Sequence, residues 1–410
     1  MRRTSSGPDR GGASRGACEN RFSEGVDHPP SPIGLRGIVR APSGRRAAWL
    51  LLTLAAAGCD DGPGSPTPIG PGADDSRELL VLNSTGRTIA RFSLNGSLDE
   101  DGAPIDLGAL FDGTTIDATE THAVTTISSF GGSRILFAEL ATGAISAVGF
   151  PSPEGLAANP SRATFDAAGS AWFAGRGSDA VYTAVPGQTT ATRTTEAVGT
   201  FVEAVVPVGP ELAAIDAFID DDGGTFAPLG PSRVFVIDAI GALIDVIDLP
   251  GEARNALGGV VVDGRLVVLL GGTFDENTLV PVGDGGLVVV DVADRSTGPF
   301  VPLDANGVSI EAGEDGLVYV TSTADFEATS LVSFDPAAGS FVASPSAPID
   351  VRDAAGDDVS CWTATALADG RLLCVTFSVF EAGRLLLLDV DGSAIDEMPS
   401  GFGSTDLLLR

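Results

Sequence analysis

The stretch "RVFVID" at residues 233–238 is an apolar run closed by an acidic residue, and it recurs along the chain. Its counterparts are "RILFAE" (134–139), "GLVVVD" (286–291), "SLVSFD" (330–335) and "RLLLLD" (384–389), with weaker copies in "TIARFS" (88–93) and "AVYTA" (180–184). The seven copies end 44 to 54 residues apart. Short runs rich in Val, Ile and Leu and bounded by turn residues are typical of β-strands. A fixed period of this length indicates a repeat architecture.

Further strands flank each copy. A second strand, such as "ELAAIDA" (211–217), precedes it, and a third lies earlier, often joined to the second by Asp-Gly (263–264, 315–316 and 369–370). Asp-Gly favours two-residue hairpins, in which both central positions have positive φ. A strand also follows each copy, so each unit has four antiparallel strands. Seven such units predict an all-β chain folded as a seven-bladed β-propeller.

The two ends of the repeat region predict how the ring closes. The first unit begins at Glu78 with its second strand, so its innermost strand is missing. The last unit ends near Ser400 and leaves "GSTDLLLR" (403–410), which is one strand long. We predict that this strand completes the first blade. A six-bladed ring with one irregular unit is the main alternative, and a tandem of immunoglobulin-like domains fits the regular spacing less well.

Two stretches carry a family resemblance. "LLVLNSTGRTIARFSLNG" (79–96) and "VFVIDAIGALIDVIDLPG" (234–251) resemble YVTN- and NHL-type repeats. The resemblance covers residues 78–410 and implies a propeller, but it names no activity.

The N-terminal region resembles a bacterial export signal. "RRAAWLLLTLAAAGCDD" (45–61) has two Arg, an eleven-residue apolar run and a cysteine. The run is too short to span a bilayer and suits a signal peptide. "AAGC" (56–59) resembles the bacterial lipobox, which implies cleavage before Cys59 and lipid on its thiol; Ala56 stands where that family most often has Leu. The predicted segments are a disordered leader at 1–44, a signal peptide at 45–58, a flexible Gly/Pro/Asp tether at 59–77 and the propeller at 78–410. Either the leader is unusually long or translation starts later, for example at Val39, and we favour the later start.

Composition excludes several function classes. From residue 59 onward the chain has 51 of its 55 acidic residues and 15 of its 24 basic residues, all of which are Arg. This negative charge repels nucleic acid and anionic lipid headgroups. We therefore expect no nucleic-acid partner and no membrane contact other than the lipid anchor. The chain has two histidines, His28 and His122, which argues against multi-histidine metal sites and most catalytic triads.

Loops predicted to share one face of the propeller contain the candidate binding residues. The loops at 218–232, 273–285, 324–329 and 378–383 combine Phe with acidic residues and contain no Arg. The predicted binding face consists of Asp220, Asp221, Asp222, Phe226, Phe274, Asp275, Glu276, Phe326, Glu327, Phe380 and Glu381. Exposed aromatic residues on rigidly presented loops are good anchors for a partner. In the alternative interpretation, each Phe covers its own blade and the acids only solvate the loops.

Other polar residues receive structural interpretations. Asp238, Asp291, Asp335, Asp389 and Glu139 close the recurring strands, and we expect them to cap turns rather than bind metal. Asp220, Asp221 and Asp222 are weak calcium candidates. Cys361 and Cys374 are a candidate disulfide in an oxidising compartment, although a tight turn at 369–370 would place Cys374 opposite Thr365.

Together these features predict a function. We expect a lipoprotein of the bacterial cell envelope, anchored in the inner or outer membrane with its propeller in the periplasm or on the cell surface. The propeller would serve as a non-catalytic binding scaffold for an envelope protein or small ligand, without a cofactor other than the lipid. The alternative is a propeller enzyme of the lactonase or lyase type. A carboxylate with a strongly raised pKa at the centre of the ring would favour this alternative.

Overall fold

The computed structural model describes residues 77–108, 115–129, 132–151, 158–194, 198–220, 227–275, 278, 280–326, 328–378 and 380–410. The predicted leader, signal peptide and tether therefore lie outside the described residues. Those described form β-strands joined by turns and loops, and none of their segments is a helix able to cross a membrane.

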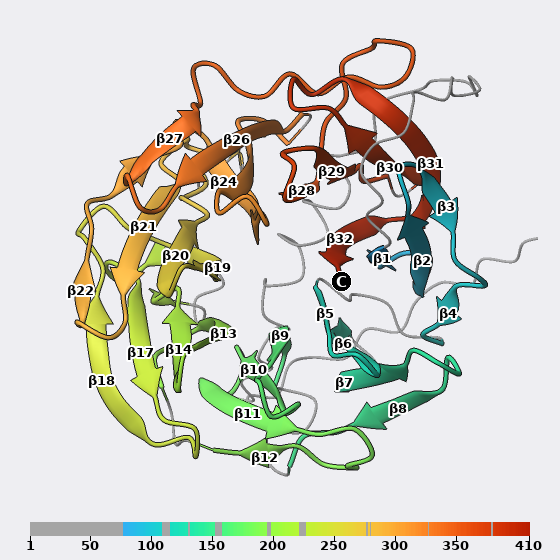
Figure 1. The fold of residues 1–410 in the computed structure, drawn as a ribbon. Helices are drawn as coiled ribbons and strands as arrows, with labels where there is room; N and C mark the ends of the chain where they lie inside the picture. Colours follow the sequence, from blue (N-terminus) through green and yellow to red (C-terminus); the bar gives the residue numbers. More distant parts are fainter. Residues whose placement is uncertain are drawn as a thin grey trace, which may run out of the picture. The chain divides into compact units, whose positions relative to one another are not determined.

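Seven antiparallel sheets form the blades of a β-propeller (Figure 1). From the centre outward, the first blade consists of β32 (Ser404–Leu409), β1 (Arg77–Asn83), β2 (Thr88–Leu94) and β3 (Leu98–Glu100), with β4 (Ile105–Asp106) also on β2. The second blade consists of β5 (Ile116–Ala118), β6 (His122–Ser129), β7 (Gly132–Glu139) and β8 (Ile145–Val148). The third blade consists of β9 (Pro160–Phe165), β10 (Ala171–Gly175), β11 (Ala180–Ala184) and β12 (Thr192–Arg193).

The remaining four blades repeat this order. The fourth blade consists of β13 (Val202–Val208), β14 (Glu211–Asp216), β17 (Arg233–Ile237) and β18 (Leu243–Asp248). The fifth consists of β19 (Ala256–Val262), β20 (Arg265–Leu270), β21 (Gly286–Asp291) and β22 (Ser296–Thr297), with β23 (Val301–Pro302) on β21. The sixth consists of β24 (Asn306–Ala312), β25 (Val318–Thr323), β26 (Ser330–Asp335) and β27 (Ser340–Ala343), and the seventh of β28 (Thr363–Ala366), β29 (Leu372–Val375), β30 (Ala382–Leu388) and β31 (Ala394–Phe402). A two-stranded hairpin of β15 (Ile219–Asp220) and β16 (Ala227–Pro228) extends the fourth blade's loop. The seven-bladed prediction is confirmed, and the six-bladed alternative is wrong.

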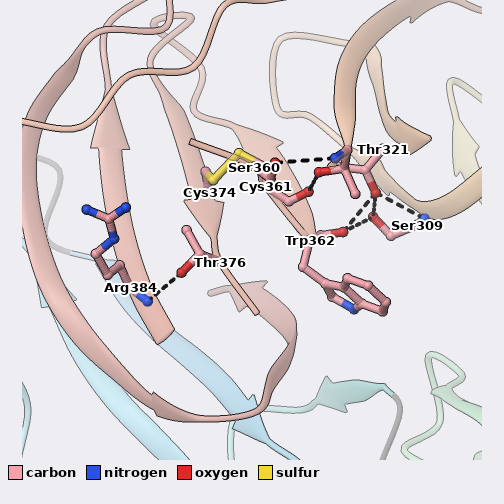
Figure 2. The surroundings of a disulfide bond; sticks show 9 residues. Ser309, Thr321, Ser360, Cys361, Trp362, Cys374, Thr376 and Arg384 are labelled. Carbon is pink, nitrogen blue, oxygen red and sulfur yellow. Dashed lines mark hydrogen bonds between the residues drawn. A yellow bond between two sulfur atoms is a disulfide. The ribbon is translucent and has the colours of Figure 1, made fainter. Parts of the chain in front are cut away.

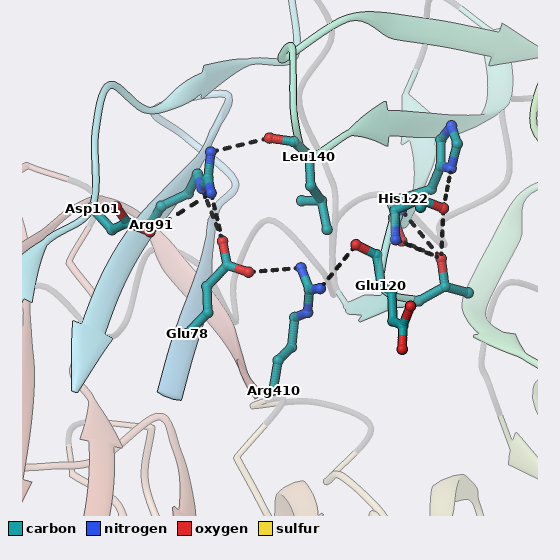
Figure 3. Close-up of polar contacts among 9 residues, drawn as sticks. Glu78, Arg91, Asp101, Glu120, His122, Leu140 and Arg410 are labelled. Atoms are coloured by element: carbon teal, nitrogen blue, oxygen red, sulfur yellow. Dashed lines mark hydrogen bonds and ion pairs between the residues drawn. The ribbon is translucent and has the colours of Figure 1, made fainter. Parts of the chain in front are cut away.

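The C-terminal strand closes the ring as the sequence predicts. β32 pairs antiparallel with β1, from Leu79 opposite Leu409 to Asn83 opposite Ser404. Figure 3 shows how the last residue is held: Arg410 lies 2.8 Å from the Glu78 carboxylate and donates to the carbonyl of Glu120 in the second blade. Because Glu78 also pairs with Arg91, one carboxylate joins the two ends of the propeller.

The core explains why the recurring strand is an unbroken apolar run. Successive side chains of a strand point to opposite faces, and both faces of each blade are covered by neighbouring blades. Val234 and Val236 of β17 pack into a cluster shared with the fifth blade, whereas Phe235 and Ile237 pack into one shared with the third. In β1, likewise, Leu79 and Val81 contribute to one cluster and Leu80 and Leu82 to another.

Aspartates protect backbone N–H groups on edge strands. Asp117 in β5 and Asp406 in β32 each accept the N–H of the next residue, as do Asp245 in β18 and Asp396 in β31. The first two strands are innermost and the last two outermost, so each has one side without a neighbouring strand in its blade. An acidic side chain on an N–H group that faces away from the sheet discourages unwanted strand pairing.

The Asp-Gly turns differ from the prediction in two of three cases. At Asp263-Gly264 both residues have positive φ and Val262 pairs with Arg265, which is the expected two-residue hairpin. At 315–316 and 369–370, only Gly is left-handed and the loop is longer, as shown by the bond from the Gly370 N–H to the Leu367 carbonyl. The longer loop shifts the register and places Ala364, not Thr365, opposite Cys374.

The closing strand makes a testable contribution to stability. Leu407→Ala should lower the free energy of unfolding by about 2–5 kcal/mol, because Leu407 is 3% exposed and packs between the first and seventh blades. Denaturant unfolding followed by circular dichroism measures this change. Leu409→Ala, at the half-buried end of the same strand, is the matched control. Equal losses in the two variants would contradict the closure described above.

Candidate functional site

Two of the predicted aromatic residues meet across adjacent blades. Phe274 follows β20 in the fifth blade and Phe326 follows β25 in the sixth, and their rings stack with centroids 5.7 Å apart and planes inclined by 16°. Both side chains are half-buried. The prediction placed them on one face, and the structure brings these two into direct contact.

The loop bearing Phe326 has an unusual backbone. Phe326 has φ of +66°, a left-handed conformation that bulky residues seldom adopt. Its N–H donates to Thr323 Oγ1, and the same hydroxyl donates to the Ala328 carbonyl. Such strain persists only where surrounding contacts enforce it, and it concentrates at functional sites. Here the polar contacts of one threonine hold the backbone that presents the ring.

The opposite loop is anchored to the inner strand of the next blade. Asp284 accepts the Thr273 N–H at 2.6 Å and its hydroxyl at 2.8 Å. The Asn306 amide of β24 accepts the Gly283 N–H and donates to the Thr273 carbonyl. The stem of the Phe274 loop is therefore fixed before any partner binds.

The other predicted binding residues have different surroundings. Phe380 is 68% exposed and Glu381 is exposed beside it. Asp275 accepts the N–H and hydroxyl of Thr278, so it caps a turn within its own loop. Asp221, Asp222, Phe226, Glu276 and Glu327 lie outside the described residues, as does the side chain of Asp220, so the calcium prediction is not tested.

The recurring strand-end acids cap turns as predicted. Asp238 accepts the N–H groups of Ile240 and Ala242, and Asp335 accepts those of Ala337 and Ala338. Asp291 likewise accepts the Asp294 N–H and Asp389 the Val390 N–H, whereas Glu139 accepts the hydroxyl of Thr142 and no backbone N–H of the described residues. Within the described ranges, no group of three His, Cys, Asp or Glu side chains is placed to hold a metal ion.

Cys361 and Cys374 form a disulfide (Figure 2). Cys361 precedes β28 and lies outside its ladder, with a Cα–Cα distance of 5.6 Å to Cys374 in β29. The Cys361 carbonyl accepts the hydroxyl of Thr329, and the Trp362 carbonyl accepts that of Thr321 at 2.8 Å. The disulfide segment thus joins the seventh blade to the sixth-blade loop that carries Phe326.

A cluster of ionisable residues at the ring centre is not predicted from the sequence. It includes Asp117 on β5, Arg162 on β9, Glu311 on β24 and Asp406 on β32, each the one ionisable residue of its innermost strand. Glu203 on the innermost strand β13 also interacts with Arg162, but it is paired with Arg176. Arg162 lies against β19, where a Cβ on Gly258 would come within 2.9 Å of its Nε. A charge isolated within an apolar innermost strand was the signal that could have identified this cluster.

Two of these carboxylates also join blades. Asp406 accepts the Ile116 N–H of the second blade at 2.7 Å, and Asp117 accepts the Phe165 N–H of the third blade at 2.7 Å. Glu311 differs, since no hydrogen bond reaches its side chain from the described residues.

Burial and mutual repulsion shift the acidity of the cluster. Burial raises the pKa of Glu311 well above its usual range, and the charges of Asp406 and Asp117 raise it further against the opposing effect of Arg162. Burial raises the pKa of Asp406 to about 6, although Arg162 and the backbone N–H groups lower it. Burial also raises the pKa of Asp117. A single arginine does not neutralise three carboxylates.

His122 is held in a structural position. Its ring Nδ1 lies 2.9 Å from the hydroxyl of Thr121, and its backbone N–H donates to Thr119 in the turn before β6 (Figure 3). It belongs to β6 rather than to an innermost strand, and it is not among the ionisable residues at the ring centre.

The fold resembles solved structures at low sequence identity. No protein-family model and no curated protein matches the chain. A protein from Lactobacillus plantarum matches with a TM-score of 0.57 and 13% identity over 82% of this chain and 99% of its own. A Bacteroides fragilis protein proposed to be a 6-phosphogluconolactonase gives 0.55 and 12% over 83% and 100%, and streptogramin B lyase gives 0.51 and 12% over 75% and 89%. These matches show the propeller fold alone.

The central carboxylates predict an unusual pH dependence of stability. With a pKa near 6 in the folded protein and 3.8 ordinarily, Asp406 binds more protons in the folded than in the unfolded state between these values. Stability should therefore rise as the pH falls from about 7 to about 4, before acids with lowered pKa such as Asp353 reverse the trend.

Glu311→Gln tests this dependence. It removes a half-buried carboxyl group whose ionised form is disfavoured by desolvation and by the charges of Asp406 and Asp117, so it should raise the melting temperature at pH 7.5 by a few degrees and by less at pH 5. Thermal unfolding by calorimetry at both pH values measures the difference. Glu252→Gln, in an exposed turn, should change neither temperature. A lower melting temperature for Glu311→Gln at pH 7.5 would mean that the Glu311 charge is compensated.

Proposed function

We propose that this protein is a lipoprotein of the bacterial cell envelope whose β-propeller is a non-catalytic binding scaffold. The lipid on Cys59 would anchor the chain in the inner or outer membrane, and the tether would hold the propeller in the periplasm or on the cell surface. Its partner would be an envelope protein or a small ligand that contacts the loops of the fifth, sixth and seventh blades.

The stack of Phe326 on Phe274 carries this proposal. An aromatic pair built from loops of two blades, with one residue in a left-handed conformation, is better explained by recognition than by core packing, since the main apolar clusters lie between the blade strands. The contacts of Asp284 and Thr323 hold both loops, which reduces the entropy lost on binding.

Substitution of the aromatic residues tests the recognition surface. Phe274→Ala together with Phe380→Ala should abolish capture of the partner from an envelope extract while lowering the melting temperature by only a few degrees. Val390→Ala is the control, because Val390 is 64% exposed in the turn between β30 and β31, away from these loops. A large loss of melting temperature without loss of a captured partner would favour the interpretation in which each Phe only covers its blade.

The anchor is tested separately. In a bacterial host fed with an alkyne-tagged fatty acid, the wild-type chain should acquire the tag and sediment with membranes, whereas Cys59→Ala should remain untagged. Cys18→Ala, in the leader, is the matched control and should behave as wild type. Tagging of Cys59→Ala would contradict the lipobox interpretation.

The central cluster supports a second candidate, an enzyme of lactonase or lyase type. A carboxyl group with a raised pKa can act as a general acid, and no hydrogen bond from the described residues accounts for the position of the Glu311 side chain. The binding scaffold is favoured because Asp117 and Asp406 have a structural role between blades.

A pH-stat assay with a panel of small lactones tests the enzyme candidate. Turnover that Glu311→Gln removes and Glu252→Gln retains would support catalysis. Absence of turnover, or turnover unaffected by Glu311→Gln, would contradict a catalytic role for the cluster.

A further inference from the structure

The outermost strand of the fourth blade is exposed to an unusual degree. In β18, Leu243, Ile244 and Val246 are 39–49% exposed, and Ile240 in the preceding turn is 82% exposed. Figure 1 shows β18 at the rim of the ring. Val246 on β18 lies opposite Phe235 on β17, and the Phe235 ring packs against the third blade. Val246 therefore extends the apolar face of the fourth blade to its outer edge. The outer strand of the third blade, β12, has only two residues, and the adjacent Thr194 lies against Gly241 in the turn before β18.

Other outer strands of the described blades are shorter or covered. β22 has two residues. The Leu98 N–H of β3 donates to Asp396, and the Ala394 N–H of β31 donates to the carbonyl of Arg352. Gly149, which follows β8, bridges to the outer segment of the third blade. By contrast, β18 has six residues and, among the described strands, pairs only with β17. A long apolar edge strand is an established template for strand addition.

Charge selects the kind of segment that this edge accepts. The outward N–H of Val246 donates to Asp245 Oδ1 at 2.8 Å. An incoming strand must displace this carboxylate to reach the N–H, and a basic side chain on the same face of that strand would then share Asp245 with Arg295, whose Nε lies 3.7 Å from the carboxylate. An acidic side chain on this face of the incoming segment would be repelled by Asp245.

We propose that β18 is a docking edge for an extended partner segment that alternates apolar and basic side chains and adds to the fourth blade as a fifth strand. A second copy of this chain fits less well. Two antiparallel β18 strands would bring acidic residues of both copies together, and the whole chain has a formal net charge of −31. This edge is independent of the loop surface formed by Phe274 and Phe326.

Fluorescence anisotropy with labelled twelve-residue peptides, at 150 mM salt, tests the proposal. The probe alternates lysine and valine; one control peptide replaces lysine with glutamate, and another replaces valine with proline, which keeps the charge but prevents strand pairing. The lysine–valine peptide should bind the wild-type protein at least tenfold more tightly than either control.

Variants locate the binding. Val246→Lys should weaken the lysine–valine peptide at least tenfold, and Ile244→Lys provides a second edge substitution if the first impairs folding. Val342→Lys is the matched control, because Val342 is 65% exposed on β27, the outer strand of the sixth blade. Equal binding of the proline peptide, or equal effects of Val246→Lys and Val342→Lys, would overturn the proposal. A wild-type dimer that Val246→Lys dissociates, without peptide binding, would also overturn it in favour of self-pairing.

Discussion

The pairing of β32 with β1 is the constraint on which the propeller depends. Strands from the two ends of the repeat region lie side by side in one blade, and Glu78 contacts both Arg91 and Arg410. The same strands supply Leu79, Val81 and Leu407 to the apolar cluster between the first and seventh blades. Because each blade is covered by its neighbours on both faces, an open seam would expose two such faces at once. Closure therefore allows every blade, including the first and the seventh, to pack against a neighbouring blade on both faces.

Acidic residues have three distinct roles in this acidic chain. At strand ends they cap turns, as Asp238 does; on edge strands they satisfy outward N–H groups, as Asp245 does; and between innermost strands they join blades, as Asp406 does through Ile116. The third role places carboxylates together with Arg162 at the ring centre and raises the pKa of Asp406 and Glu311. We therefore expect Asp406, which connects two blades, also to reduce stability near neutral pH.

The sequence predicts the fold better than it predicts the site. Repeat spacing and the leftover strand at 403–410 are one-dimensional signals, so seven blades and their closure follow from them directly. The position of Cys361 does not, because it depends on a loop longer than Asp-Gly suggests and on a residue outside the ladder. The stack of Phe326 on Phe274 and the meeting of four isolated charges at the centre require the arrangement of blades in space. A local pattern cannot show which loops or strands become neighbours.

Hydrogen exchange followed by mass spectrometry tests the closure of the ring most directly. In the closed ring, peptides covering β32 should exchange as slowly as those covering β1 and much more slowly than the exposed turn around Asp263-Gly264, because the β32 amides belong to a ladder that opens only with the first blade. Exchange of residues 404–409 within seconds, with β1 still protected, would contradict it, since the C-terminal segment would then be a free tail and the first blade would have three strands.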